Sequence, residues 1–368
     1  MRRWRCLGEN ESGSVSFAGT SDRYKAQPIK VDTMTDSARL YHSQYWTENA
    51  WCADWVKAQP SSYWRNMVDA ICTHWITWLP PEERLAYLAS EDGRRVGSDQ
   101  LYLRMSQASS DFVPWLDTVA ADRKRVLEIG GGAGSSTAAL ARAGYSVTTV
   151  DIAESFLAIG RIRADSLALR YDQILADENW LNTPESVERV FMQAKYPQII
   201  VCYALFEHLT IAERLVLLTA IKQKMLNSPN LLLAIWETPN RLAPFDWHSS
   251  KTLLPDIVPD ELSKLYLEAT LPSSHPWRRH APWNQPDGQT AWARTGRGMS
   301  FHELHAVFGP GGYEVIQDGY WQPDAQAHYK PVLEFETALQ NIFSATSPPI
   351  HRAFCRPSLN LIIKIAAT

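Results

Sequence analysis

Two kinds of hydrophobic periodicity divide the chain. Between residues 36 and 120, apolar side chains recur every three or four positions, which is the spacing of amphipathic helices. From residue 125 onward, short and nearly continuous apolar runs alternate with helix-length segments. Buried parallel strands have this pattern because helices cover both faces of their sheet. The chain is therefore expected to be an α/β protein with a helical N-terminal extension.

The apolar runs predict seven strands, at residues 125–129, 146–150, 173–175, 197–203, 231–236, 313–317 and 359–365. After residue 239 the alternation of apolar runs and helix-length segments is interrupted for about 60 residues that are rich in Pro, Trp, His and Arg. The predicted segments are a loose polar arm over 1–35, a helical extension or lid over 36–120, a core over 121–238, a cap insert over 239–298 on the substrate side, and the C-terminal part of the core over 299–368.

Composition excludes several classes of protein. The longest apolar runs fall far short of the roughly 18 residues of a membrane span, and no apolar leader is visible near the start. The five cysteines form no C-x-x-C pair, which argues against a disulfide framework or a cysteine zinc site. A net charge of −4 argues against a nucleic-acid partner. These features predict a cytoplasmic protein with neither a membrane nor a nucleic-acid partner.

The strongest chemical signal lies between the first strand and the helix that follows it. Glu128 ends the strand, and glycines alternate after it at Gly130, Gly132 and Gly134. Glycine lets the backbone approach a ligand closely, and a helix N-terminus offers unpaired N–H groups. The NAD fingerprint needs G-x-G-x-x-G, which is absent here, so an NAD-dependent oxidoreductase is disfavoured. Asp151 closes the second strand, where a carboxylate can accept hydrogen bonds from ribose hydroxyls.

This E-x-G-x-G-x-G pattern with an acidic residue after the second strand resembles class I S-adenosylmethionine (SAM)-dependent methyltransferases. The resemblance covers about residues 110–238 and 299–368 and implies a Rossmann-like core with SAM as cofactor. It implies that the three glycines pass close to the methionine part of SAM. It also implies that Glu128 holds the SAM amino group, directly or through water, and that Asp151 binds the ribose.

The same resemblance assigns roles to four further positions. Ile152 would pack on the adenine, and Asp177 would meet the adenine amino group. Cys202 and Tyr203, at the end of the fourth strand, would line the cofactor and substrate sides. A narrower resemblance, to a group of bacterial class I methyltransferases, rests on the segment T-P-N-R-L…F-D-x-H after the fifth strand and on G-R-G-M-S-F-H-E-L at residues 296–304.

Methyl transfer requires that nucleophile and methyl group are held in line, and a base when the acceptor is a hydroxyl or amine. In an open α/β sheet such groups follow the carboxyl ends of the strands. The candidates there are His208, Asp246 and His248, with His248 first because imidazole titrates near neutral pH. His208 could equally be a helix-start residue beside the cofactor. No fixed metal-binding pattern is present, so no metal is expected.

The cap insert suggests how an acceptor could be held. Its aromatic and basic side chains fit a solvated lid with charges at its rim, and the alternative is an enclosed pocket for a carboxylate-bearing substrate. The residues assigned to substrate binding are Trp247, Trp277, Arg278, Trp292 and His302.

The function predicted from the sequence is methyl transfer to an oxygen, or else a nitrogen, of a small molecule or modified peptide. Two alternatives stay open: a SAM-binding scaffold subunit without catalysis, and a protein or nucleic-acid methylase that docks through the basic insert. The oligomeric state is undetermined, and a homodimer is one option.

Overall fold

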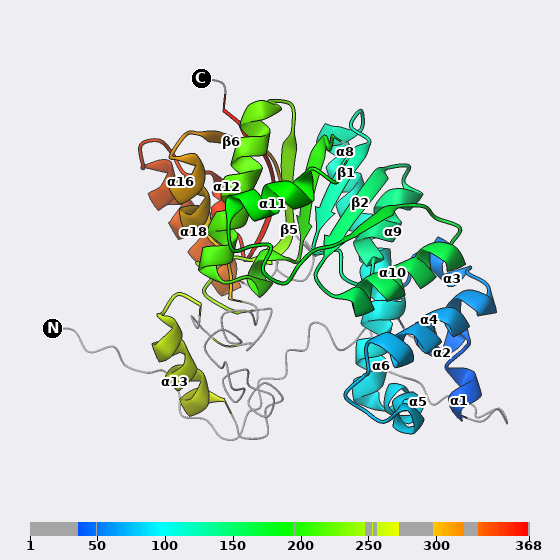
Figure 1. The fold of residues 1–368 in the computed structure, drawn as a ribbon. Helices are drawn as coiled ribbons and strands as arrows, with labels where there is room; N and C mark the ends of the chain where they lie inside the picture. Colours follow the sequence, from blue (N-terminus) through cyan, green and yellow to red (C-terminus); the bar gives the residue numbers. More distant parts are fainter. Residues whose placement is uncertain are drawn as a thin grey trace.

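The computed structural model describes residues 36–48, 50–194, 196–246, 252, 256–271, 297–319 and 330–366. Seven strands form one sheet in the order β3-β2-β1-β4-β5-β7-β6 (Figure 1). The strands are β1 (Arg125–Ile129), β2 (Ser146–Asp151), β3 (Asp172–Leu175), β4 (Ile199–Tyr203), β5 (Leu232–Pro239), β6 (Tyr313–Asp318) and β7 (Ser358–Ile365). Only β7 runs antiparallel to its neighbours, β5 and β6. The prediction of a seven-stranded, mostly parallel sheet is confirmed.

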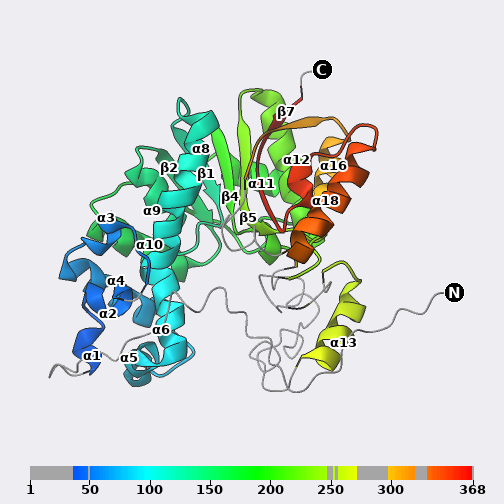
Figure 2. The ribbon, with the colours of Figure 1, turned by 180° about the vertical axis from the view of Figure 1, so that it is seen from behind.

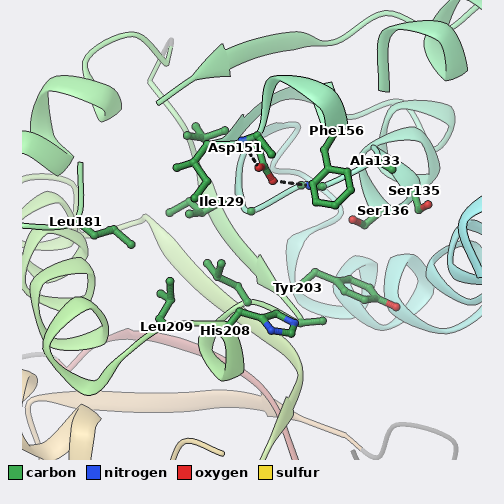
Figure 3. A pocket seen from close by; sticks show the side chains of 18 of the residues that line it. Ile129, Ala133, Ser135, Ser136, Asp151, Phe156, Leu181, Tyr203, His208 and Leu209 are labelled. Atoms are coloured by element: carbon green, nitrogen blue, oxygen red, sulfur yellow. Dashed lines mark hydrogen bonds between the residues drawn. The ribbon is translucent and has the colours of Figure 1, made fainter. Parts of the chain in front are cut away.

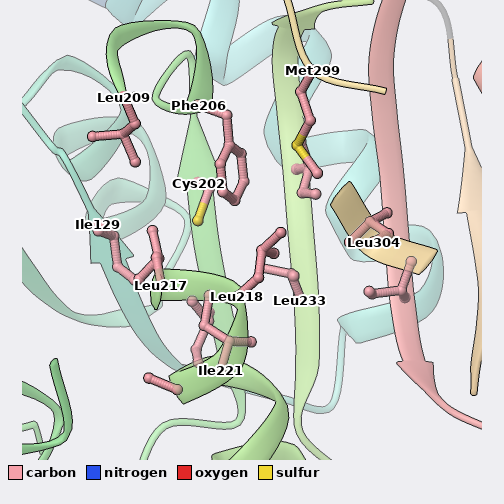
Figure 4. Packing of buried hydrophobic residues seen from close by; sticks show 14 of the residues in the cluster. Ile129, Cys202, Phe206, Leu209, Leu217, Leu218, Ile221, Leu233, Met299 and Leu304 are labelled. Carbon is pink, nitrogen blue, oxygen red and sulfur yellow. The ribbon is translucent and has the colours of Figure 1, made fainter. Parts of the chain in front are cut away.

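Helices cover both faces of the sheet. They are α8 (Val113–Ala120), α9 (Ser135–Arg142), α10 (Glu154–Ser166), α11 (Pro184–Phe191), α12 (Ile211–Asn227), α16 (Phe301–Phe308) and α18 (Lys330–Ser344). Because strand side chains alternate, Leu127 and Ile129 of β1 enter the core under α11 and α12, while Val126 packs toward α8 and α9. The first core also contains Cys202 and Phe206 (Figure 4).

The helical extension lies beside the end of the sheet where β1 and β2 terminate (Figure 2). Its elements are α1 (Asp36–Arg39), α2 (Ser43–Thr47), α3 (Asp54–Lys57), α4 (Ser61–His74), α5 (Pro81–Ala89), α6 (Glu91–Ser98), α7 (Arg104–Gln107) and the π-helical segments η2 (Asp99–Leu103) and η3 (Ala108–Phe112). From α6 to α8 the chain is helical without a break. The extension has its own core, with Trp46 and Trp64, and α4 packs against α10.

The chain leaves and rejoins the core at adjacent points around the cap insert. Met299 N–H donates to the Pro239 carbonyl at 2.9 Å, and Arg241 N–H donates to the Met299 carbonyl at 2.9 Å. Among the described insert residues, α13 (Asp260–Thr270) is tied to the returning chain, because Arg297 Nη1 donates to Ser263 Oγ at 3.0 Å. In the described ranges, no helix combines the length and apolar character needed to cross a membrane.

Candidate functional site

A cavity of about 900 Å³ opens at the carboxyl ends of β1, β2 and β4 (Figure 3). Its wall includes Ile129, Asp151 and Tyr203 from the ends of these strands, and it also includes Gln100 and Arg104 from the helical extension. This volume lies within the usual range of roughly 300–1,000 Å³ for small-molecule sites. The cavity therefore lies where the sequence placed the cofactor, and the extension closes part of it.

The glycine-rich loop adopts backbone conformations that favour glycine. Gly130, Gly132 and Gly134 have φ values of +73°, +52° and +75°. A Cβ atom on Gly130 would lie 2.6 Å from Leu205 Cδ1, whereas one on Gly132 would meet nothing within 4 Å. Since Gly132 lines the cavity, this open space is available to a ligand. The loop is shaped for close approach and is not filled by its own side chains.

Glu128 lies under this loop and outside the cavity wall. Its carboxylate is fully buried and accepts hydrogen bonds from Ser136 Oγ at 2.5 Å and from Thr137 Oγ1. Burial raises the pKa of Glu128, and the hydroxyl hydrogen bonds oppose that rise. In this structure Glu128 fastens the loop to the start of α9. Its proposed contact with the SAM amino group stays a prediction.

Asp151 reaches the cavity from the end of β2. Its Oδ2 accepts the Gly132 N–H at 2.8 Å, and its Oδ1 accepts the Ala153 N–H at 2.9 Å. Each carboxylate oxygen has two lone pairs, so one on each oxygen remains for a ligand hydroxyl. Ile152 is 47% exposed on the cavity wall, an apolar surface suited to a flat ring.

The loop after β3 places its residues differently from the sequence expectation. Asp177 Oδ1 accepts the Asn179 N–H at 2.8 Å, and Asp177 is not part of the cavity wall. Glu178 and Asn179 do line the cavity. Within this loop, the acidic residue on the cavity wall is therefore Glu178, one position further along the chain.

The end of β4 separates two residues that the sequence analysis grouped together. Tyr203 lines the cavity, whereas the Cys202 side chain points to the opposite face and is buried in the core (Figures 3 and 4). Alternation along a strand requires this separation. Ala204 and Glu237, after β4 and in β5, have φ values of +47° and +60°, a strained conformation for residues with side chains. Strained backbone of this kind is common at functional sites.

An ion pair that the sequence analysis missed joins the extension to the sheet. Arg104 of α7 lines the cavity and pairs through Nη1 with Glu237 Oε1 and through Nε with Asp99 Oδ2 at 3.3 Å. Burial raises the pKa of Glu237, and the neighbouring Arg104 charge opposes that rise. Burial and the Glu237 charge raise the pKa of Tyr203. No motif marks Arg104, because the contact joins residues far apart in sequence.

The predicted catalytic and substrate residues are scattered. His208, in the 3₁₀ turn η4 (Phe206–His208), lines the cavity. Asp246 is buried outside the cavity wall. Burial raises the pKa of the nearby Asp256, and the Asp246 charge adds to that rise. His302 Nδ1 lies 2.9 Å from Ser300 Oγ at the start of α16, also away from the cavity. Outside the described residues lie Trp247, His248, Trp277, Arg278 and Trp292.

A buried acidic residue precedes His208 in the same turn. Glu207 is fully buried, and in the described residues neither of its carboxylate oxygens has a hydrogen-bond partner. Burial raises its pKa to about 7. Among the described residues, no group of three or more His, Cys, Asp or Glu side chains has a metal-binding arrangement.

Comparison with known proteins agrees with the geometry of the loop and sheet. Residues 126–225 match the model of a family described as a methyltransferase domain. This match spans β1 to α12 and so contains the glycine-rich loop, Asp151 and the end of β4. A comparison with curated proteins finds no match to the chain.

Several solved structures are similar to the chain at low identity. N,N-8-amino-8-demethyl-D-riboflavin dimethyltransferase from Streptomyces davawensis has 16% identity and a TM-score of 0.36 over 71% of this chain and 66% of that one, just under two thirds. Mitomycin 7-O-methyltransferase has 14% identity and a TM-score of 0.40 over 91% and 74%. Human N-acetylserotonin methyltransferase, solved with SAM, has 12% identity and a TM-score of 0.38 over 95% and 74%. At these values, the substrates named for the three enzymes belong to those enzymes alone.

Proposed function

We propose that the cavity binds SAM and that the enzyme methylates an oxygen, or else a nitrogen, of a small molecule or modified peptide. The match of residues 126–225 to a methyltransferase-domain family supports this proposal. The observation that carries the proposal is the cavity itself. It lies at the glycine-rich loop, it has room above Gly132, and Asp151 faces it from the next strand. The cavity volume of about 900 Å³ and the net charge of −4 favour a small acceptor over a nucleic acid.

The residues in the wall fit the parts of SAM. Asp151 has free lone pairs for the ribose hydroxyls, and Ile152 offers an apolar face for the adenine. Arg104 is a cation in the wall and suits the methionine carboxylate, since guanidinium binds carboxylate in a bidentate manner. The acids Asp99 and Glu237 next to Arg104 hold its side chain in place and compete for its charge.

The cofactor would supply a methyl group on a positively charged sulfonium. The chain must then align the acceptor with that methyl group, exclude water and take up the acceptor's proton. The extension forms part of the cavity wall through Gln100 and Arg104, and this side of the site would help to shield a bound cofactor from water. His208 lines the same cavity and is one residue that can hold a proton there.

Cofactor binding tests the proposal directly. SAM and S-adenosylhomocysteine should each raise the melting temperature, and NAD should not. Asp151→Ala should weaken SAM affinity by roughly tenfold or more, because two charge-assisted hydrogen bonds to the ribose are lost at about 1.4 kcal/mol per factor of ten. Isothermal titration calorimetry measures the affinity, and the exposed Asp122→Ala is the control.

Two results would contradict this proposal. A thermal shift with NAD but not with SAM would refute the assigned cofactor. Unchanged SAM affinity in Asp151→Ala would refute the position of the ribose. Labelled SAM incubated with separate small-molecule, protein and nucleic-acid fractions then identifies the acceptor class, and absence of transfer to all three would support the scaffold alternative.

A further inference from the structure

The charged side chains that line the cofactor cavity are mostly acidic. Four carboxyl side chains line it, each from a different element: Asp99 of η2, Asp151 of β2, Glu178 of the loop after β3 and Glu213 of α12. In the described part of the wall, Arg104 is the only arginine or lysine. With His208 counted as neutral, four carboxylates and one guanidinium give this wall a net charge of −3.

The four carboxyl groups are placed to carry their charge. All four side chains are at least partly exposed, and hydrated carboxyl groups are ionised at neutral pH. Two of them are also oriented by neighbours. Asp99 Oδ2 accepts Arg104 Nε at 3.3 Å, and Glu213 Oε2 accepts the Thr210 N–H at 2.8 Å in the capping box of α12. The wall is therefore a negatively charged surface at pH 7.

Arg104 leaves little positive charge for an anionic acceptor. Its guanidinium pairs with Asp99 and with the buried Glu237, so two carboxylates face one positive charge. Under the proposed function, Arg104 also binds the methionine carboxylate of the cofactor. No cation of the described wall then remains for a carboxylate on the acceptor.

Charges behind the wall do not reverse its sign. Arg163 donates to the Ala133 carbonyl at 3.0 Å, and Arg214 pairs with Glu303 Oε1 at 3.3 Å, so both buried arginines are bound by protein acceptors. Three further carboxyl groups are buried behind or beside the wall: Glu128, Glu207 and Glu237. The field at the cavity therefore favours positive charge.

The cofactor does not neutralise this surface either. SAM carries a sulfonium, an ammonium and a carboxylate group, and S-adenosylhomocysteine lacks the sulfonium charge. The net wall charge of −3 becomes −2 with SAM and stays −3 with S-adenosylhomocysteine. Asp151 is assigned to the ribose, whereas Asp99 and Glu213 come from elements that hold neither ribose nor adenine in that assignment. These two carboxylates are available to the acceptor.

We propose that the acceptor is a small molecule with a basic nitrogen, and that it binds as a cation whose charge is balanced by Asp99 and Glu213. This inference rests on the proposed function and narrows its substrate class. A protonated amine donates hydrogen bonds to carboxylates, whereas an anionic acceptor is repelled by them. The expectation of a carboxylate-bearing substrate drew on Arg278, which lies outside the described residues. The described wall favours the opposite charge.

Three small probes of different charge test this class. Benzylamine, benzyl alcohol and benzoate share one ring, and each is titrated at pH 7 by ligand-observed NMR into protein loaded with S-adenosylhomocysteine. Benzylamine should bind about tenfold more tightly than benzoate, with benzyl alcohol between them, because only the charge of the polar group differs in sign. Raising the salt concentration from about 0.05 M to about 0.5 M should reduce this preference, since salt screens exposed charges.

Two conservative variants locate the charges responsible. Asp99→Asn and Glu213→Gln each remove one wall charge at nearly constant size, and glutamine can still form the capping box of α12. Each should reduce the preference for benzylamine over benzoate by about two- to threefold, and the double variant should reduce it further. Asp122→Asn is the matched control, because it removes the same charge from an exposed residue outside the cavity wall. Its preference should be unchanged.

The outcomes separate this inference from the proposed function. Tighter binding of benzoate, absence of benzylamine binding, or an unchanged preference in the double variant would overturn the inference, provided that the protein binds S-adenosylhomocysteine. An equal loss of preference in Asp122→Asn would also overturn it, because net charge and not the wall would then be responsible. Failure of both SAM and S-adenosylhomocysteine to bind would instead refute the proposed function.

Discussion

At the scale of single residues, burial of Glu207 should make the stability of the protein depend on pH. Its carboxyl has an ordinary pKa of 4.5 when unfolded and a pKa of about 7 when folded. Between these pH values the folded protein holds more of this proton than the unfolded chain, so this group's contribution to stability is lost as pH rises.

Glu207→Gln should therefore become more stable relative to the unmodified enzyme as pH increases. The change in relative free energy of unfolding between pH 4.5 and 8 should approach about 3 kcal/mol, because one pKa unit corresponds to about 1.36 kcal/mol. Urea denaturation at four pH values across this window measures it. A difference that stays constant with pH would show that Glu207 is not buried as a carboxylate in solution.

The residues of the candidate site were predictable from the sequence where the backbone alone decides which side chains face the cavity. Gly132, Asp151 and Ile152 line the cavity because the ends of parallel strands meet at one edge of the sheet. Cys202 could have been excluded by strand alternation. The complete burial of Glu207 could not be predicted, because F-E-H in a sequence does not show how far each side chain is exposed.

At the scale of elements, the glycine-rich loop offers a test that separates strain from ligand contact. Gly132 and Gly144 both have positive φ, +52° and +87°, and a Cβ on either meets nothing within 4 Å. Only Gly132 lines the cavity, whereas Gly144 lies in the turn between α9 and β2. Alanine at either position should lower the free energy of unfolding by a similar amount, about 1 kcal/mol.

The two alanine variants should differ in cofactor affinity. Gly132→Ala should weaken SAM binding at least tenfold, because its methyl group occupies ligand space, while Gly144→Ala should leave the dissociation constant unchanged. Calorimetric titration compares them. Equal affinities would mean that the cofactor does not pass close to this turn of the loop.

Strands followed the sequence more closely than helices did. The first strand is predicted and observed at Arg125–Ile129, because Val126, Leu127 and Ile129 form a short apolar run that is buried in the sheet. The helical extension was predicted over 36–120 without the bounds of its helices, and the continuous helical stretch before β1 begins at Glu91. The first part of this stretch contains Gly93 and Gly97, and glycine has a low helix propensity, so its sequence does not indicate a helix. A Cβ on Gly97 would lie 2.8 Å from the Trp46 ring, so tertiary packing selects glycine there against its low helix propensity.

At the scale of the whole molecule, the helical extension and the α/β core together line one cavity. Their docking depends on Arg163 of α10, which is fully buried. Its guanidinium donates to the carbonyl of Ala133 in the glycine-rich loop at 3.0 Å. It also donates to the Tyr63 hydroxyl at 3.2 Å and to the Gln100 carbonyl at 2.5 Å in the extension. Sequence patterns report only local periodicity. The contact between Tyr63 and Arg163, which are far apart in the sequence, could therefore not be predicted from them.

Replacement of Arg163 should therefore loosen the extension and weaken the cofactor site together. Arg163→Met keeps a long side chain but leaves several buried acceptors without donors, each at a cost of about 1–3 kcal/mol. Hydrogen–deuterium exchange should quicken in residues 91–120 and in the loop at 130–134, and SAM should restore part of the protection because it contacts both. Arg161→Met on the same helix is the control, since Arg161 is half exposed and pairs only with Glu154 and Gln173 among the described residues. Faster exchange in the extension alone, with an unchanged loop and unchanged SAM affinity, would show that the two parts are coupled through other contacts.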